Sequence, residues 1–352
     1  MKRILLFVAL LFAVTAVYAQ TTPERYVREG YVYDKATKEP VPSVMVYIDG
    51  TSYFGITDDK GRYKIRVPHG IDSKVIFSHV SYKTFSVPIY KLSGMVYIEE
   101  SINVIDPVSV TASKFDSQRE KMIRAFREHF LGNDADARKC IIENEDDIQF
   151  KYDEGVLYAW IDTPLIVNNV YLGYRIHIDL KDFNLEFKNK NNINSSNAGK
   201  VYYSYYSVFE DLHEGKRIYN SRRKTLYQRT PLCFFRNVIR GTLKETNFIL
   251  ENKGEVINPR NYFEVTDITA DLKYVEIPLK RFEEVELGTY SGYLYSILDI
   301  TYNKTIKSQI IFKTSEFYVN YYGIPKEYKL IEYYGDMGNQ RVAQTLPLDF
   351  EP

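Results

Sequence analysis

Short segments of alternating apolar and polar residues, each ended by a turn, constrain the fold of residues 28–112 more than any other feature. In residues 43–48 the even positions are apolar, and in residues 62–67 the odd positions are. This alternation indicates β-strands with one buried face, and no helical periodicity continues over a dozen residues. The sequence therefore predicts an antiparallel β-sandwich.

Seven strands are predicted in this part of the chain. Their ranges are 28–33, 43–48, 53–57, 62–67, 74–79, 84–87 and 96–98. Residues 57–61, Thr-Asp-Asp-Lys-Gly, are predicted to form a hairpin turn, because Asp accepts hydrogen bonds from nearby amides and Gly61 tolerates a positive φ. A calcium loop is the alternative for the two aspartates, but their spacing is not that of a hand loop.

An ordered set of short motifs runs through the same region. They are GYVYD at 30–34, TKEPVP at 37–42, VYIDGT at 46–51, TDDKGRY at 57–63, VP at 67–68 and FSHVSY at 77–82. This succession resembles the carboxypeptidase-regulatory-like domains, which are transthyretin-like β-sandwiches. The resemblance implies a sandwich over residues 27–112 and does not imply an activity.

The same motifs are similar to the N-terminal extension of TonB-dependent outer-membrane receptors of Gram-negative bacteria. Residues 106–112, DPVSVTA, are similar to the strand that leads those receptors into their plug. Only 240 residues follow Ala112, too few for a plug and a large barrel. The chain is therefore predicted to lack both.

Residues 1–19 have the three parts of an export signal. Lys2 and Arg3 precede an apolar run over residues 4–17, and a small-residue cleavage site ends at Ala19. The run is shorter than the roughly 20 apolar residues of a spanning helix. We therefore expect an exported protein, periplasmic or associated with the outer membrane, with no transmembrane helix after signal cleavage.

The rest of the chain is predicted to be α+β. A capping box of Ser117 and Glu120 begins a helix over residues 117–131, and residues 113–145 are predicted to be a helical connector. A domain over residues 146–350 follows. It is predicted to have a mostly antiparallel sheet and, between residues 221 and 240, a helical pair divided at Thr230.

Within this domain, three or four strands are predicted over residues 149–187 and an exposed loop over residues 189–200. The later strands are 274–278, 292–301, 308–312, 317–322 and 328–334. A looser resemblance, over residues 162–174, 205–209, 222–223 and 234–236, is to the region after the sandwich in exported carboxypeptidase-like regulatory proteins of unassigned role. It brings no catalytic residues with it.

Sequence motifs for common catalytic chemistries are missing. None of the five histidines has a second His within five residues or a Glu three residues downstream, and no Gly-x-Ser-x-Gly or nucleotide-binding glycine motif occurs. No cofactor and no metal site are predicted. Cys140 and Cys233 are not a Cys-x-x-Cys pair, and whether they form a disulfide stays open.

Two groups of residues are candidates for binding. The basic group contains Arg222, Arg223, Arg229 and Arg236. It forms either an anion-binding groove, for an acidic polysaccharide, phosphate or lipid headgroup, or a solvated helix face, which is the favoured interpretation. We expect the variant with Arg222, Arg223 and Arg236 all replaced by Ala to fold and to lose affinity for an anion.

The second group comes from the high tyrosine content, 32 residues in 352. Tyr203, Tyr205 and Tyr206 lie in a strand pattern, where rings can stack on sugars or fill an interface. Tyrosine also simply favours strands, so most members of the tyrosine clusters between residues 202 and 334 are expected to be structural.

These observations predict a non-catalytic exported envelope protein that binds or scaffolds a protein or glycan partner, either free in the periplasm or in peripheral association with the outer membrane. Basic and acidic residues balance at 46 each, so nucleic acid is not an expected partner. The first alternative is a hydrolase whose active site, in the C-terminal α+β domain, is assembled from residues distant in sequence. The second is a small outer-membrane barrel.

Overall fold

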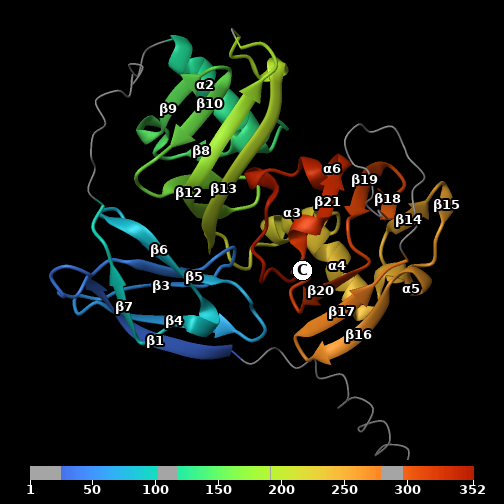
Figure 1. The fold of residues 1–352 in the computed structure, drawn as a ribbon, viewed down its shortest axis with the longest axis horizontal. Helices are drawn as coiled ribbons and strands as arrows, with labels where there is room; N and C mark the ends of the chain where they lie inside the picture. Colours follow the sequence, from blue (N-terminus) through green and yellow to red (C-terminus); the bar gives the residue numbers. More distant parts are fainter. Residues whose placement is uncertain (1–24, 102–116, 191, 279–295) are drawn as a thin grey trace, which may run out of the picture.

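The computed structural model describes residues 25–101, 117–190, 192–278 and 296–352 (Figure 1). The predicted export signal at residues 1–19 lies outside this range. Figure 1 shows a blue N-terminal sandwich, a green sheet with helix α2 next to it, and the yellow to red elements beside both.

Two sheets form the N-terminal sandwich, which confirms the predicted fold. The first has the strand order β4-β1-β7 and the second β3-β2-β5-β6. Their bounds are β1 Arg25–Asp34, β2 Met45–Ile48, β3 Phe54–Ile56, β4 Arg62–Pro68, β5 Lys74–His79, β6 Tyr82–Pro88 and β7 Met95–Ile98. All pairs are antiparallel except β1 with β7, which is parallel.

The predicted turn at residues 57–61 is present, but the strands that it joins do not pair. Asp58 accepts hydrogen bonds from the amides of Lys60 and Arg62, both at 2.9 Å, and Gly61 has a φ of 71°. β3 belongs to one sheet and β4 to the other. The turn therefore crosses between the sheets and does not close a hairpin.

Next in the chain, helix α2, Ser117–Phe130, packs on a six-stranded sheet of order β8-β11-β12-β10-β9, with β13 paired to β12. The strands are β8 Ile141–Ile142, β9 Gln149–Asp153, β10 Val156–Trp160, β11 Leu165–Asn169, β12 Tyr174–Phe187 and β13 Ala198–Asp211. Phe126 and Phe130 of α2 are fully buried and contact the ring of Phe183 on β12. The helix thus belongs to the same core as the sheet.

The helical pair is present as α3, Arg217–Tyr227, and α4, Pro231–Arg240. The hydroxyl of Thr230 caps α4 by accepting from the amide of Cys233, and Gly241, with a φ of 67°, ends it. A proline in the first turn has no amide hydrogen to leave unpaired. The division predicted at Thr230 is therefore confirmed.

Two further antiparallel sheets complete the C-terminal region, with orders β15-β14-β18-β19-β21 and β16-β17-β20. Their strands are β14 Phe248–Asn252, β15 Glu255–Val256, β16 Glu264–Thr269, β17 Leu272–Glu276, β18 Ser296–Tyr302, β19 Ile306–Phe312, β20 Glu316–Asn320 and β21 Ile331–Tyr334. The short helices are α5 Pro259–Tyr262 and α6 Gly335–Asn339. The strand predicted at 328–334 was wrong in its first half, since residues 328–330 form a 3₁₀ turn.

One large hydrophobic core joins α2, α4 and strands of all three C-terminal sheets, and the sandwich has its own core. The predicted domain boundaries stay a prediction, because the first falls among residues 102–116, outside the described part. The predicted fold class, a sandwich followed by mostly antiparallel sheets with few helices, is confirmed.

The sandwich and the C-terminal region share a buried contact. Tyr47 and Ile76, on the outer face of the sheet β3-β2-β5-β6, are fully buried against Val208 of β13. Two backbone hydrogen bonds extend the contact. The amide of Gly50 donates to the carbonyl of Ser207 at 2.7 Å, and the amide of Phe209 donates to the carbonyl of Thr51 at 2.9 Å. The central part of this outer face, over β2 and β5, is therefore an interior surface of the molecule.

Candidate functional site

Of the four predicted site arginines, Arg223 is buried inside the protein. Its guanidinium donates to both carboxylate oxygens of Asp211, at 2.6 and 2.7 Å, and to the backbone carbonyls of Leu172 and Gly173. Its side chain lies 3.8 Å from the ring centre of Tyr174. These contacts join α3 to the sheet that contains β12, so Arg223 has a structural role.

Arg236 of α4 is also buried, and it holds the C-terminal segment of the chain. It donates to the carbonyls of Leu348 and Phe350, both at 2.5 Å, and to the carbonyl of Tyr322 at 3.0 Å. With Arg223 and Arg236 both buried, the expectation that the triple alanine variant folds normally is reversed. Neither an open groove nor a solvated face describes these two side chains.

Arg222 and Arg229 are partly exposed, and each has its own partner. Arg222 lies over the ring of Tyr171 at 4.7 Å, and Arg229 pairs with Asp336 at 2.7 Å. The structure thus gives each of the four predicted arginines a separate set of contacts. Anion binding by this group stays a prediction.

The three predicted site tyrosines do not form one row. Tyr203 and Tyr205 pack edge-on against Phe130 of α2, with ring centres at 5.3 and 5.8 Å. Tyr206 points to the other side of β13, toward the sandwich, where its hydroxyl accepts from Lys74 at 3.1 Å. Tyr203 and Tyr205 therefore complete the core, and Tyr206 belongs to the contact with the sandwich.

Asp179 is the centre of a buried polar cluster in that same contact. Its carboxylate accepts hydrogen bonds from the hydroxyls of Tyr47, of Ser78 at 2.9 Å and of Thr84 at 2.7 Å. Burial first, and then the charge of Asp179, raises the pKa of Tyr47 well above its usual range. The cluster is closed inside the protein, so it joins the two regions and is not an open reaction site.

Both cysteines are free and buried. Burial raises the pKa of the Cys140 thiol to about 12 and that of Cys233 to about 11. A thiol must ionise to attack, so these two are suited to packing and not to nucleophilic chemistry.

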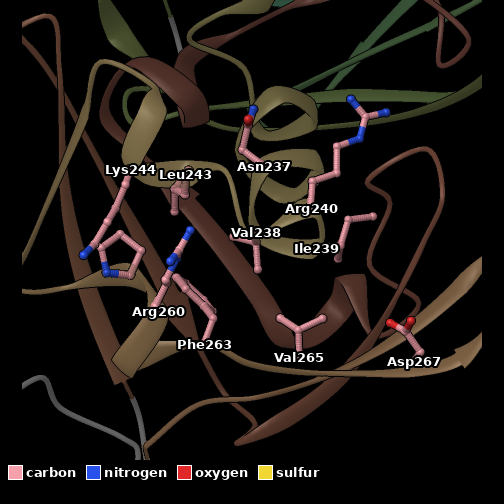
Figure 2. A pocket seen from close by; sticks show the side chains of 12 residues that line it. Asn237, Val238, Ile239, Arg240, Leu243, Lys244, Arg260, Phe263, Val265 and Asp267 are labelled. Carbon is pink, nitrogen blue, oxygen red and sulfur yellow. The ribbon is translucent and has the colours of Figure 1, made fainter. Parts of the chain in front are cut away.

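An open pocket of about 380 Å³ lies where α4 ends, between that helix, α5 and β16 (Figure 2). Apolar side chains form much of its lining, and Val238, Leu243 and Phe263 among them are buried. Its volume is within the range of small-ligand sites. The complete lining is Asn237, Val238, Ile239, Arg240, Gly241, Leu243, Lys244, Pro259, Arg260, Phe263, Val265 and Asp267.

Cations surround this apolar lining. Figure 2 shows Lys244 and Arg260 on one side of the pocket, with Arg240 and Asp267 on the other. Asp267 is already paired with Lys273 at 2.6 Å, and within the described ranges neither Lys244 nor Arg260 has a carboxylate at ion-pair distance. The pocket therefore favours a ligand that combines an apolar body with an anionic group.

Arg240 contributes less to this preference. It lies in the last turn of α4, where a cation compensates the partial negative charge of the helix end. Its guanidinium also lies 5.8 Å from the ring centre of Tyr321. Lys244 and Arg260, which the sequence analysis missed, are the cations most available to a ligand. They are isolated in sequence, so no pattern distinguishes them.

The described residues contain no group of three or more His, Cys, Asp or Glu side chains placed to hold a metal ion. In the same part of the chain, no helix is both long enough and apolar enough to cross a membrane.

Comparison with known families agrees with the N-terminal sandwich. Residues 28–110 match the family model of the CarboxypepD_reg-like domain, so the N-terminal sandwich is a domain of this type. No curated protein matches the chain. The family match ends before the C-terminal region begins, and the pocket near α4 lies outside it.

Proposed function

We propose that the protein is a non-catalytic binding protein exported to the Gram-negative envelope, and that its C-terminal region binds a protein partner. The pocket beside α4 would receive an apolar side chain together with a carboxylate of that partner. One observation carries the proposal: Lys244 and Arg260 border a pocket lined by apolar and polar side chains, and neither has a carboxylate at ion-pair distance among the described residues. Export is supported by the N-terminal segment 1–19, in which two basic residues precede an apolar run.

Binding is tested first with a probe of the same chemistry. Anilinonaphthalenesulfonate has an aromatic body and one anionic group, and its fluorescence rises in apolar sites. Replacing Lys244 and Arg260 together by Glu is expected to weaken probe binding by about tenfold or more, since hydrogen bonds to charged groups contribute about 1.5 kcal/mol or more each. The matched control replaces Arg217 and Lys224, exposed cations of α3, by Glu.

The partner is tested by affinity capture from envelope extract with the tagged mature protein and both charge-reversal variants in parallel. The proposal requires a partner that the native protein and the α3 control capture and the pocket variant does not. Equal capture by all three proteins would refute the pocket as the binding site. Turnover of any substrate, abolished by one polar substitution between residues 113 and 352, would show an enzyme instead.

Export is tested separately by expressing the full chain in a Gram-negative host and sequencing the N-terminus of the recovered protein. Cleavage after Ala19 leaves Gln20 as the first residue. Recovery of the uncleaved chain from the cytoplasm would contradict export. The proposed binding site would then still be tested by the fluorescent probe.

A further inference from the structure

The outer face of the sheet β4-β1-β7 is open, whereas the outer face of the other sheet is covered over β2 and β5. Side chains alternate along β4 between exposed and buried, so Arg62, Lys64 and Arg66 point outward in a row. The strand register places Tyr31 opposite Arg62 on one side and Met95 on the other. A row of cations therefore runs beside a row of exposed apolar and aromatic side chains.

Three tyrosines form a continuous aromatic surface on this face. The ring centres of Tyr31 and Tyr33 are 6.2 Å apart with planes at 22°, and those of Tyr33 and Tyr97 are 5.8 Å apart at 31°. Tyr31 and Tyr97 are 39% and 43% exposed. In the described structure no residue is a hydrogen-bond partner for the hydroxyls of these three tyrosines. Rings fixed on strands offer contact area at low entropic cost.

Positive charge is in excess around these rings. Arg62 and Lys64 share a single carboxylate, that of Glu29, at 2.6 and 3.1 Å. Arg66 is exposed, with no carboxylate at ion-pair distance in the described ranges, and Lys38 lies 4.8 Å from the ring centre of Tyr97. These four cations thus outnumber the two carboxylates next to them, those of Glu29 and Asp58, and the face complements a negatively charged ligand.

We propose that the outer face of the sheet β4-β1-β7 binds an acidic polysaccharide. Tyr31, Tyr33 and Tyr97 would pack against sugar rings, and Arg62, Lys64 and Arg66 would pair with the carboxylates of the polymer. Glu29, among the cations, disfavours a polymer with a charge on every unit, such as single-stranded nucleic acid, and suits one whose charges are more widely spaced. This site is independent of the pocket near α4.

The test uses hyaluronan oligosaccharides, which carry a carboxylate on every second sugar, as the acidic probe, with neutral N-acetylglucosamine oligomers and a thymidine oligonucleotide for comparison, measured by calorimetry on the mature protein. The native protein is expected to prefer the acidic sugar over both. Two variants address the two components: Tyr31→Ala with Tyr97→Ala removes aromatic contact, and Arg66→Glu reverses one charge that has no partner to lose. Each is expected to weaken binding by about tenfold.

The variant with Lys244 and Arg260 replaced by Glu is the matched control and is expected to bind the sugar as the native protein does. Circular dichroism melting checks that the face variants fold. Should the tyrosine pair unfold the sandwich, Arg66→Glu and the salt dependence of binding still decide the question. Unchanged affinity in the folded variants, equal binding of the neutral oligomer, no measurable binding, or preference for the oligonucleotide would overturn the proposal.

Discussion

The two outer faces of the sandwich both carry tyrosine and differ in what covers them. Tyr47 lies on one face, and Tyr31 and Tyr33 lie on the other. Tyr47 is completely buried and donates to Asp179, whereas Tyr31 is exposed. The difference is that strands β12 and β13 pack on the first face and no described element covers the second.

This comparison shows how one module serves two purposes. The covered face uses hydroxyls and carboxylates to join the sandwich to the C-terminal region, because buried polar groups must be paired. The open face keeps its cations and rings available to a ligand. The covered face is therefore expected to be structural and the open face to be dispensable for folding.

The largest effect is expected for Arg236→Ala. Arg236 holds the carbonyls of Leu348 and Phe350, and the neighbouring amide of Leu348 bonds to Gly50 of the sandwich at 2.7 Å. Removing the guanidinium leaves buried carbonyls without donors, so we expect a loss of about 4 kcal/mol in the free energy of unfolding. Urea denaturation measures it. A loss below about 1 kcal/mol would contradict the anchoring role.

Asp49, at the edge of the covered face, should make stability depend on pH. Burial raises its pKa from 3.8 to about 6, although it accepts from the amide of Ser207 at 2.9 Å. As pH rises between these two values, the unfolded chain releases its proton first, so the native protein loses stability and remains less stable above about pH 6. Asp49→Asn removes this loss.

We therefore expect Asp49→Asn to be more stable than the native protein by up to about 3 kcal/mol near pH 7 and equal to it near pH 4. Thermal melting at both pH values measures the difference. Asp153→Asn, on an exposed strand end, is the control and should change stability little. A stabilisation that is the same at both pH values would rule out titration of Asp49 as its cause.

Replacing tyrosine by phenylalanine compares the two faces directly. Tyr47→Phe removes one of three donors to the buried Asp179 carboxylate and should cost about 2 kcal/mol. Tyr31→Phe, on the open face, should cost less than about 0.5 kcal/mol. Denaturant melts of both variants test this, and equal costs would remove the distinction between the faces.

A smaller effect than for Arg236 is expected for Arg222→Ala. Its guanidinium lies over Tyr171 and donates to the carbonyl of the same residue at 3.0 Å, in a partly exposed position. Loss of this contact should cost about 1 kcal/mol, well below the cost for Arg236. Equal destabilisation by both substitutions would show that burial does not separate the two arginines.

Much of the fold follows from local pattern. Alternation predicted all seven sandwich strands, and the Thr230–Pro231 pair predicted where α4 begins, since both signals reside in neighbouring residues. Strands β8, β14, β15 and β16 were missed. Nearly all of β16 is exposed, so its sequence has no buried face to produce alternation.

The candidate sites were much less predictable. Arg223 and Arg236 looked like surface cations because charge is usually solvated, and only the carbonyls and carboxylate brought to them by distant segments make their burial possible. Lys244 and Arg260 form one pocket because α5 folds back beside the end of α4. The spacing of residues in the sequence does not predict that contact.

By itself, the sequence determined which residues form strands and helices, because hydrophobic period, caps and turn residues act over a few positions. Tertiary structure alone decided which polar side chains are buried, which sheet face is covered and which cations remain without partners. Those outcomes depend on contacts such as Tyr47 with Asp179, between residues 132 positions apart. Burial is a property of the packed chain, so it cannot be read from one segment.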